Sequence, residues 1–400
     1  MNEFMRIGDI CNILNGYAFK SSKYVADGIR VIRITNVQKG FVEDTNPQYY
    51  PVSEQREIEK YMLCEGDLLM SLTGNVGRVG LLSAEMLPAA LNQRVACIRI
   101  RNPAVIYKPF LFHLLNSDYF ENKCILASQG VAQKNMSTEW LKEYPIPSFS
   151  MDKQMEIASI FDKIDDLIAR RKEQVRNMDQ AVKSRFIELF GDPVSNSMGL
   201  PTEPMTTICA IIDGDRGKNY PKQDEFSDTG YCLFLNAKNV TATGFSFENR
   251  MFITKEKDDA LHNGKLERGD VVLTTRGTLG NLAFYDDSVP FENVRINSGM
   301  VILRMKKSVM TEVFFMEQFK LQLQSIKGKI ASGSAQPQLP ISTMNKIRIL
   351  LAPMALQEQF AAFVEQTDKS KYYSSLSFRY CQAAANTYRQ EWMTCRTSDF

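Results

Sequence analysis

The sequence contains two diverged copies of one pattern. Residues 32–37 (IRITNV), 63–79 (LCEGDLLMSLTGNVGRV) and Ala132-Gln133 recur at 234–240 (FLNAKNV), 266–282 (LERGDVVLTTRGTLGNL) and Ala335-Gln336. The offset is 203 residues between Val37 and Val240, between Gly66 and Gly269, and between Gln154 and Gln357. A repeat of this length is a whole domain rather than a solenoid unit, so the chain is predicted to be a pseudo-dimer. A natural ligand of a pseudo-dimer has approximate two-fold symmetry itself, and duplex DNA is the leading candidate.

Composition sets broad limits on the fold and its location. The chain has 400 residues, of which 44% are hydrophobic and 24% are charged, which is typical of a folded protein with several cores. Its net charge is only +2, so nucleic-acid binding would need local segregation of charge. The eight cysteines form no C-x-x-C pair and there are only two histidines, which favours reduced thiols without a structural zinc. The start lacks a signal-peptide pattern and no apolar run is long enough to span a membrane, so we expect a cytoplasmic protein.

The order of elements predicts an α+β protein in which two similar domains of mixed strands and helices are joined by two long antiparallel helices. Short apolar runs in residues 1–150, such as 29–34, 67–72 and 95–100, indicate strands. Residues 151–190 contain neither Gly nor Pro and carry apolar residues mostly three or four apart, which predicts a helix of about 60 Å. Residues 355–393 also lack Gly and Pro and begin with an apolar pattern, but Thr367 and Ser370 make the rest of the seam less regular. The predicted segments are a first domain (1–150), a first long helix (151–193), a second domain (194–354), a second long helix (355–393) and a tail (394–400).

A glycine-rich segment follows a strand in each copy. Gly74, Gly77 and Gly80 follow residues 67–72, and Gly277 and Gly280 follow residues 270–275. Glycine allows a tight turn or a close approach to phosphate, but no Walker or dinucleotide fingerprint is present. A hairpin between two strands is the simpler interpretation, and it leaves neighbouring polar residues free to touch DNA.

Side chains suited to DNA gather near these turns. Arg suits guanine, Asn and Gln suit adenine, and Lys mostly contacts phosphate. The candidates in the first copy are Lys20, Lys23, Arg33, Asn36, Asn75, Arg78, Gln93, Arg94, Gln133, Lys134 and Asn135. Those in the second copy are Arg216, Lys218, Asn219, Lys222, Asn236, Lys238, Asn239, Arg276, Thr278, Arg295, Asn297, Gln336 and Gln338. Several of these residues recur at matched places, which supports a functional role as much as an ordinary solvated surface.

Signs of catalysis are weak. Residues 46–49 (NPQY) are similar to the Asn-Pro-Pro-Tyr signature of adenine methyltransferases, but Gln48 replaces the second Pro, so a loop between strands is the simpler interpretation. His113 lies in an apolar run and suits a core role. The pair Asp258-Asp259 lies in a mixed-charge stretch that we expect to be solvated. No catalytic or metal-binding residues are predicted; a DNA methyltransferase or nuclease with its own recognition domains is the alternative.

Taken in order, these motifs resemble the specificity subunit of type I restriction-modification systems. The residues that carry the resemblance are 15–20 (NGYAFK), the runs 66–77 and 269–280, 130–133, 333–336, the helix entries at Gln154 and Gln357, and 189–193 (LFGDP). The resemblance implies two target-recognition domains joined by a coiled-coil pair of helices, each domain reading one half of a split DNA target and the helices setting the gap. It also implies a non-catalytic subunit that takes part in defence against foreign DNA.

The same resemblance implies the partners. Two adenine-N6 methyltransferase subunits that use S-adenosylmethionine would dock on the chain, followed by restriction subunits that translocate and cleave DNA with ATP and Mg²⁺. The chain itself would hold no cofactor. Residues 15–24 and 213–226 show little likeness to each other, so we predict an asymmetric target with two different halves. The bases read and the gap between the halves do not follow from the sequence.

Overall fold

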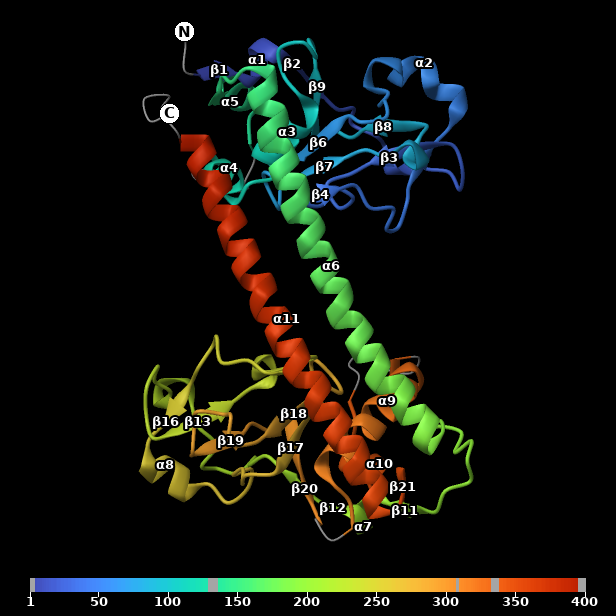
Figure 1. The fold of residues 1–400 in the computed structure, drawn as a ribbon, viewed down its shortest axis with the longest axis vertical. Coiled ribbons are helices and arrows are strands. Elements are labelled where there is room, and N and C mark those ends of the chain that lie inside the picture. Colours follow the sequence, from blue (N-terminus) through green and yellow to red (C-terminus); the bar gives the residue numbers. More distant parts are fainter. Residues whose placement is uncertain (1–3, 129–135, 307–308, 332–337, 395–400) are drawn as a thin grey trace. The chain divides into compact units, whose positions relative to one another are not determined.

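A computed structural model of the chain describes residues 4–128, 136–306, 309–331 and 338–394 (Figure 1). The chain forms two compact units: unit 1 comprises Met1–Glu173 with Ser374–Phe400, and unit 2 comprises Gln174–Tyr373. The sequence pattern predicts that the domains and the long helices follow one another along the chain. In the structure each long helix contributes one part to each unit, so unit 1 combines segments from the two ends of the sequence.

Unit 1 is built on a sheet of five strands in the order β2-β9-β6-β7-β4, beside a second sheet in the order β5-β3-β8. A two-stranded sheet, β1-β10, completes it. The strands are β1 (Phe4–Arg6), β2 (Cys11–Asn15), β3 (Ile29–Ile32), β4 (Gly40–Phe41), β5 (Tyr49–Tyr50), β6 (Leu68–Ser71), β7 (Val79–Leu81), β8 (Ala89–Leu91), β9 (Val95–Ile100) and β10 (Pro145–Pro147). The helices are α1 (Ile7–Ile10), α2 (Gln55–Ile58), α3 (Lys108–Leu115), α4 (Asp118–Ala127) and α5 (Thr138–Glu143).

Unit 2 repeats this plan. Its sheet β12-β20-β17-β18 corresponds to β2-β9-β6-β7, and β16-β13-β19 corresponds to β5-β3-β8. The strands are β11 (Thr202–Pro204), β12 (Cys209–Asp213), β13 (Cys232–Leu235), β14 (Val240–Thr241), β15 (Gly244–Phe245), β16 (Phe252–Ile253), β17 (Asp270–Thr274), β18 (Leu282–Tyr285), β19 (Val294–Ile296), β20 (Met300–Met305) and β21 (Arg348–Leu350). The helices are α7 (Met205–Ile208), α8 (Lys255–Ala260), α9 (Glu312–Ala331) and α10 (Ile341–Met344).

The long sheet of each unit is buried on both faces. In β6, Leu68 and Met70 pack in the core shared with α3 and α4, whereas Leu69 packs in the core shared with the second sheet. In β17, Val271 and Leu273 pack against α9, whereas Val272 faces the second sheet. Successive side chains of a strand point to opposite faces, so continuous apolar runs are what a doubly covered sheet requires.

The two glycine-rich segments are hairpin turns, as predicted. β6 pairs antiparallel with β7, and β17 pairs antiparallel with β18. Residues 46–48 of the NPQY segment form the loop that leads into β5, which agrees with the simpler of its two interpretations. In the described part of the chain, no helix is long and apolar enough to cross a membrane.

The long helices are α6 (Met151–Phe190) and α11 (Met354–Thr394), shown in green and red in Figure 1. Their segments within unit 1 run antiparallel: Asp165 of α6 pairs with Arg389 at 2.7 Å, and Lys172 lies over the ring of Phe378. Within unit 2 the direction is the same, since Asp179 pairs with Lys371 at 2.9 Å and Phe186 contacts Phe360. The predicted antiparallel helix pair is therefore present in both units.

A buried glutamine fixes the start of each long helix. The side chain of Gln154 accepts a hydrogen bond from the Tyr107 N–H (2.8 Å) and donates to the carbonyls of Val105 and Phe149 (3.0 and 2.9 Å). Gln357 accepts from the Thr311 N–H (2.9 Å) and donates to the Ala352 carbonyl (2.8 Å). Both side chains are fully buried. The recurrence of Gln154 as Gln357 thus has a structural cause: each amide joins a long helix to the backbone preceding an earlier helix.

Candidate nucleic-acid interface

Four loops of unit 2 meet at one end of its long sheet. We call residues 214–219, 275–280, 297–299 and 338–340 loop cluster 2. The backbone N–H groups of Thr275 and Arg276 donate to the Gly299 carbonyl (2.9 and 3.2 Å), and the Leu339 N–H donates to the Thr275 carbonyl (3.1 Å). A Cβ on Gly214 would lie 2.3 Å from the Asn297 carbonyl oxygen, so the first loop can approach the third only with glycine there.

Unit 1 has the matching loop cluster 1, formed by residues 15–20, 72–77, 92–94 and 136. The Leu72 N–H donates to the Arg94 carbonyl (3.0 Å), and the Met136 N–H donates to the Leu72 carbonyl (2.9 Å). A Cβ on Gly16 would lie 2.2 Å from the Asn92 carbonyl oxygen. The same backbone arrangement therefore presents the turns of both units.

In each unit, the hydroxyl of the last residue of β6 or β17 makes hydrogen bonds to backbone atoms of the glycine turn that follows. The Ser71 hydroxyl donates to the Asn75 carbonyl and accepts from the Arg78 N–H (3.2 Å). In unit 2 the Thr274 hydroxyl donates to the Thr278 carbonyl (2.5 Å) and accepts from the Asn281 N–H (2.9 Å). Because these bonds use backbone atoms, the side chains of the turns are free to differ between the units.

Two of the candidate DNA readers are parts of this frame instead. Asn36 accepts from the Arg33 N–H and donates to the carbonyls of Glu43 and Thr45. In the same way, the Asn239 side chain accepts a hydrogen bond from the Asn236 N–H and donates to the carbonyls of Ser246 and Asn249. Only 3% of Asn36 and 2% of Asn239 is exposed. Both side-chain amides are buried and bonded to the backbone, so neither residue is available to contact DNA from the surface.

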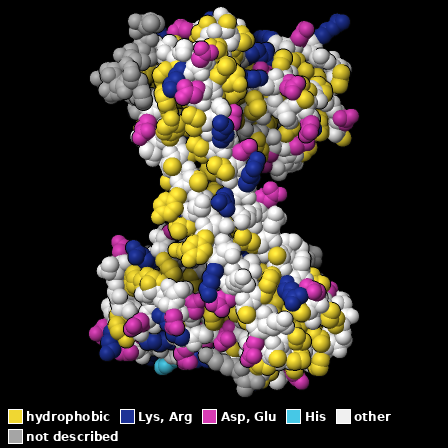
Figure 2. Space-filling view, in the orientation of Figure 1, with side chains coloured by type: hydrophobic (Ala, Val, Ile, Leu, Met, Phe, Trp, Pro, Cys, Tyr) yellow, Lys and Arg dark blue, Asp and Glu magenta, His cyan; other side chains and the backbone are white. Residues whose placement is uncertain are grey.

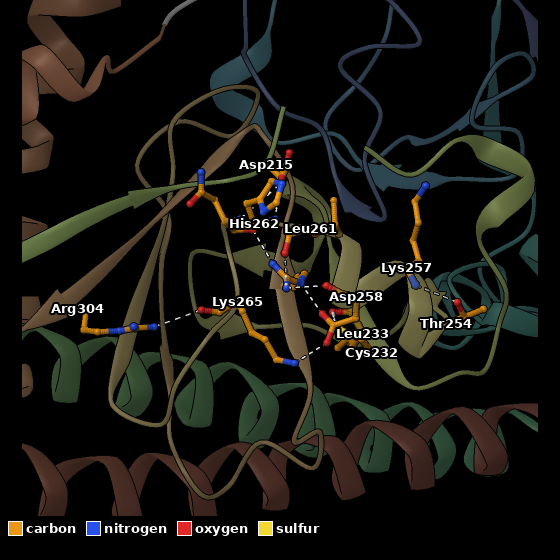
Figure 3. A network of polar contacts seen from close by, with 12 residues as sticks. Asp215, Cys232, Leu233, Thr254, Lys257, Asp258, Leu261, His262, Lys265 and Arg304 are labelled. Carbon is orange, nitrogen blue, oxygen red and sulfur yellow. Dashed lines mark hydrogen bonds and ion pairs between the residues drawn. The ribbon is translucent and has the colours of Figure 1, made fainter. Parts of the chain in front are cut away.

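A third candidate, Arg295, lies in a buried ion network of unit 2, of which Figure 3 labels Asp258 and Lys265. Its guanidinium pairs with the Asp258 carboxylate and donates to the carbonyls of Asn263 (2.7 Å) and Leu261 (3.1 Å). The Lys265 ammonium binds the other Asp258 oxygen at 2.5 Å. Asp258 is 0% exposed, so the expectation that it is solvated was wrong. Arg295 is 4% exposed, so it is not available to contact DNA from the surface either.

The electrostatics of this network follow from its partners. Burial alone would raise the pKa of Asp258, but the hydrogen bonds and charges of Lys265 and Arg295 outweigh it and lower that pKa. Asp258 is therefore a buried anion held by two cations. A buried charge persists only with such partners, and the network fixes α8 and β19 next to each other.

The other candidates are at least partly exposed. The half-buried ones in unit 1 are already bonded: Arg33 donates to the Asn46 carbonyl (2.7 Å) and Arg78 to the Gln38 amide oxygen (2.8 Å). Lys23 is exposed but pairs with Glu54 at 2.7 Å. The exposed candidates without such a bond in the described part are Lys20, Asn75, Gln93 and Arg94. Gln133, Lys134 and Asn135 lie outside the described residues.

In unit 2 the half-buried candidates shape their own loops. Asn219 donates to the Ala260 carbonyl, Asn236 accepts from the Lys238 N–H, and Asn297 accepts from the Gly299 N–H. The exposed candidates are Arg216, Lys218, Lys222, Lys238, Arg276, Thr278 and Gln338. Gln336 lies outside the described residues.

The structure brings three of these candidates together. Arg216, Arg276 and Gln338 line one cavity of about 240 Å³ in loop cluster 2, with Asp213 and Thr275. Arg216 is held there by Asp213 (3.1 Å) and by the Ser298 carbonyl (3.3 Å). Two arginines and a glutamine around one recess carry guanidinium and amide groups suited to a base edge or a phosphate.

Sequence reasoning missed Asp215, which positions this loop. Its buried carboxylate accepts from the backbone N–H groups of Gly217 (2.7 Å), His262 (2.8 Å) and Asn263 (3.4 Å). Burial would raise the pKa of Asp215, but these three donors lower it. The signal was present in the sequence, because an Asp two residues before a Gly in a loop is typical of a side-chain-capped turn.

The face shown in Figure 2 carries no large patch of one charge. On the face shown in Figure 2, basic and acidic side chains lie interspersed over both units. Among the described residues, no three His, Cys, Asp or Glu side chains are grouped so that they could hold a metal ion.

Comparison with known proteins agrees with this arrangement. A sequence profile of the type I restriction modification DNA specificity domain matches residues 2–177 and 206–372, one segment for each copy of the repeat. The MjaVIII specificity subunit of Methanocaldococcus jannaschii is 26% identical over 185 residues, and the EcoAI specificity subunit of Escherichia coli is 33% identical over 171 residues. These matches cover 45% and 42% of this chain and 43% and 28% of the two relatives, so the chain spans less than half of either.

Two solved structures share the fold over nearly the whole chain. One is the S subunit of a type I restriction-modification system from M. genitalium, with a TM-score of 0.52, 15% identity, and coverage of 98% of this chain and 96% of that one. The other, from work on complex assembly of the type I R-M system, has a TM-score of 0.53, 15% identity, and coverage of 98% and 97%. With both sequence segments matched and the fold shared, this chain belongs to the type I restriction modification DNA specificity domain family.

Proposed function

We propose that the chain is the DNA specificity subunit of a type I restriction-modification complex, in which each unit reads one half of an asymmetric two-part target. The observation that carries this proposal is that the two units hold their glycine turns with the same hydrogen bonds but carry different side chains on them. The hydrogen bonds of Ser71 and Thr274 match between the units, but the turn they close carries Thr73 in unit 1 and Arg276 in unit 2. Constant backbone with variable polar side chains is what two readers of different sequences require.

The partners are part of the same proposal. Two adenine-N6 methyltransferase subunits, which bind S-adenosylmethionine, and ATP- and Mg²⁺-dependent restriction subunits would supply the chemistry. The chain supplies recognition only, in the cytoplasm. The long helices α6 and α11 are the proposed ruler for the gap between the two halves of the target.

Selection from a random duplex library tests DNA reading. The full-length chain, alone and together with a type I methyltransferase subunit, is incubated with the library at moderate salt, and bound DNA is sequenced. We expect two short motifs of different sequence at a fixed spacing. A library that stays random under both conditions would contradict the proposal.

A chimaera tests whether the units read separately. Residues 1–150 are replaced by the corresponding segment of another family member, and the selection is repeated after circular dichroism has shown an unchanged helix content. We expect one motif to change and the other to persist. A change in both motifs would contradict separate reading.

The enzyme alternative has its own test. The purified chain is incubated with DNA, Mg²⁺ and labelled S-adenosylmethionine without any other subunit. We expect neither methyl transfer nor cleavage. Turnover by the chain alone would favour a methyltransferase or nuclease.

A further inference from the structure

The cavity in loop cluster 2 has the chemistry of a base-edge reader. Its lining residues include Arg216, Arg276 and Gln338, beside the apolar residues Leu339 and Ile341. Arg216 is committed to Asp213 and to the Ser298 carbonyl. Arg276 is exposed and has no acidic partner among the described residues, so its guanidinium is the available cation of this cavity.

The backbone at Arg276 is held by hydrogen bonds to the Gly299 carbonyl. The N–H groups of Thr275 and Arg276 both donate to the Gly299 carbonyl, and the Thr275 hydroxyl donates to the same oxygen (3.0 Å). The next residue, Gly277, has φ of +72°, a conformation that glycine adopts without strain. A long side chain on a fixed backbone can hold the two parallel hydrogen bonds that an Arg makes to the O6 and N7 atoms of guanine.

The matching position in unit 1 offers different chemistry. Thr73 occupies the position in unit 1 that Arg276 occupies in unit 2. The preceding residues are held in the same way: the Leu72 N–H donates to the Arg94 carbonyl, and the Thr275 N–H donates to the Gly299 carbonyl. Thr73 is half-buried, and its hydroxyl oxygen has no hydrogen-bond partner among the residues that the structure describes. A short hydroxyl cannot make the two-pronged contact with guanine, so the two units must differ in what they read from this position.

We infer that Arg276, supported by Gln338 in the cavity, reads a guanine in the half-target of unit 2, and that unit 1 reads no guanine from the matched residue Thr73. This inference rests on the proposed function and adds to it one base and the residue that selects it. Lysine could not replace Arg276, because an ammonium supplies charge without the planar pair of donors.

The test repeats the library selection with Arg276→Ala and Arg276→Lys in the full-length chain. Arg176→Ala is the matched control, because it removes one exposed positive charge of unit 2 from a helix instead of a loop. We expect a guanine at one position of one half-target in the wild type. Arg276→Ala should reduce the preference for that guanine about 5- to 150-fold, the range for one lost bidentate contact.

The variants separate base reading from charge. Arg276→Lys should relax the same position while keeping the salt dependence of binding close to that of the wild type, and Arg176→Ala should leave the motif unchanged. An unchanged motif in Arg276→Ala, a relaxed base other than guanine, or full preference retained by Arg276→Lys would overturn the inference while leaving the proposed function intact. A wild-type chain that selects no motif would instead overturn the proposed function, and the inference with it.

Discussion

The buried glutamines at the starts of the long helices give a prediction whose size can be worked out from the structure. In Gln357→Ala, the Thr311 N–H and the Ala352 carbonyl both lose their partner inside the protein. Each unsatisfied buried group costs about 1 to 3 kcal/mol, so unit 2 should lose about 2 to 6 kcal/mol of its free energy of unfolding. Gln154→Ala leaves three groups without a partner, so the loss in unit 1 should be at least as large.

The two units can be followed separately, because both tryptophans of the chain, Trp140 and Trp392, lie in unit 1. Equilibrium unfolding in urea is measured by tryptophan fluorescence, which reports on unit 1, and by far-ultraviolet circular dichroism, which reports on both units. Gln154→Ala should shift the fluorescence transition, whereas Gln357→Ala should shift only the transition seen by circular dichroism.

Two further substitutions control this measurement. Gln→Met at either position keeps the volume of the side chain but not its hydrogen bonds, so it should remain strongly destabilising if the bonds matter. Gln180→Ala, at an exposed position of α6, should stay within about 0.5 kcal/mol of the wild type. Alanine variants of Gln154 and Gln357 that unfold like the Gln180 variant would refute the reasoning.

The remaining predictions concern the buried Asp258–Arg295 ion pair and the buried side chain of His113. Asp258→Asn leaves Arg295 buried without its counter-charge and should cost unit 2 about 3 to 5 kcal/mol, measured by circular dichroism in urea; a loss below about 1 kcal/mol would show that water replaces the pair. Because the native pKa of Asp258 is lowered, its stabilisation is present above about pH 4 and should disappear as the pH falls further, and the Asn variant should lack this dependence. Burial lowers the pKa of His113 in spite of its hydrogen bond to Asp162, so the unfolded chain binds the proton more readily and unit 1 should lose stability as the pH falls below about 6.5. His113→Phe should flatten the fluorescence-detected stability between about pH 5 and 7, and an unchanged slope would assign the dependence to other groups.

The sequence predicted the architecture well because the relevant signals are local. The absence of Gly and Pro from 151–190 predicted a helix with the bounds that α6 has, and the apolar run 95–100 is β9. The second long helix was less regular in sequence because Thr367 and Ser370 interrupt its apolar seam. In the structure their hydroxyls donate to the carbonyls of Phe363 and Gln366 four residues earlier, so the helix itself satisfies them.

The candidate site was harder to predict because a residue can recur in both units either to contact DNA or to hold the fold. Asn36 and Asn239 recur because both units need the same buried turn, whereas Arg276 has no arginine counterpart. Ranking the candidates by recurrence therefore favoured residues that hold the fold over Arg276, the proposed base reader. Arg295 was misplaced for another reason: its partner Asp258 lies 37 residues earlier, and such a long-range pairing leaves no local pattern in the sequence.

The interleaving of the units has a consequence for biosynthesis. Unit 2 is one continuous segment, whereas the core of unit 1 includes Trp392, and its Asp165 is bound by Arg389, both beyond Tyr373. On the ribosome, unit 2 can therefore complete its core before unit 1 does, although translation starts with unit 1. A premature stop shortly after Tyr373 would consequently damage the domain that was translated first and spare the one translated second.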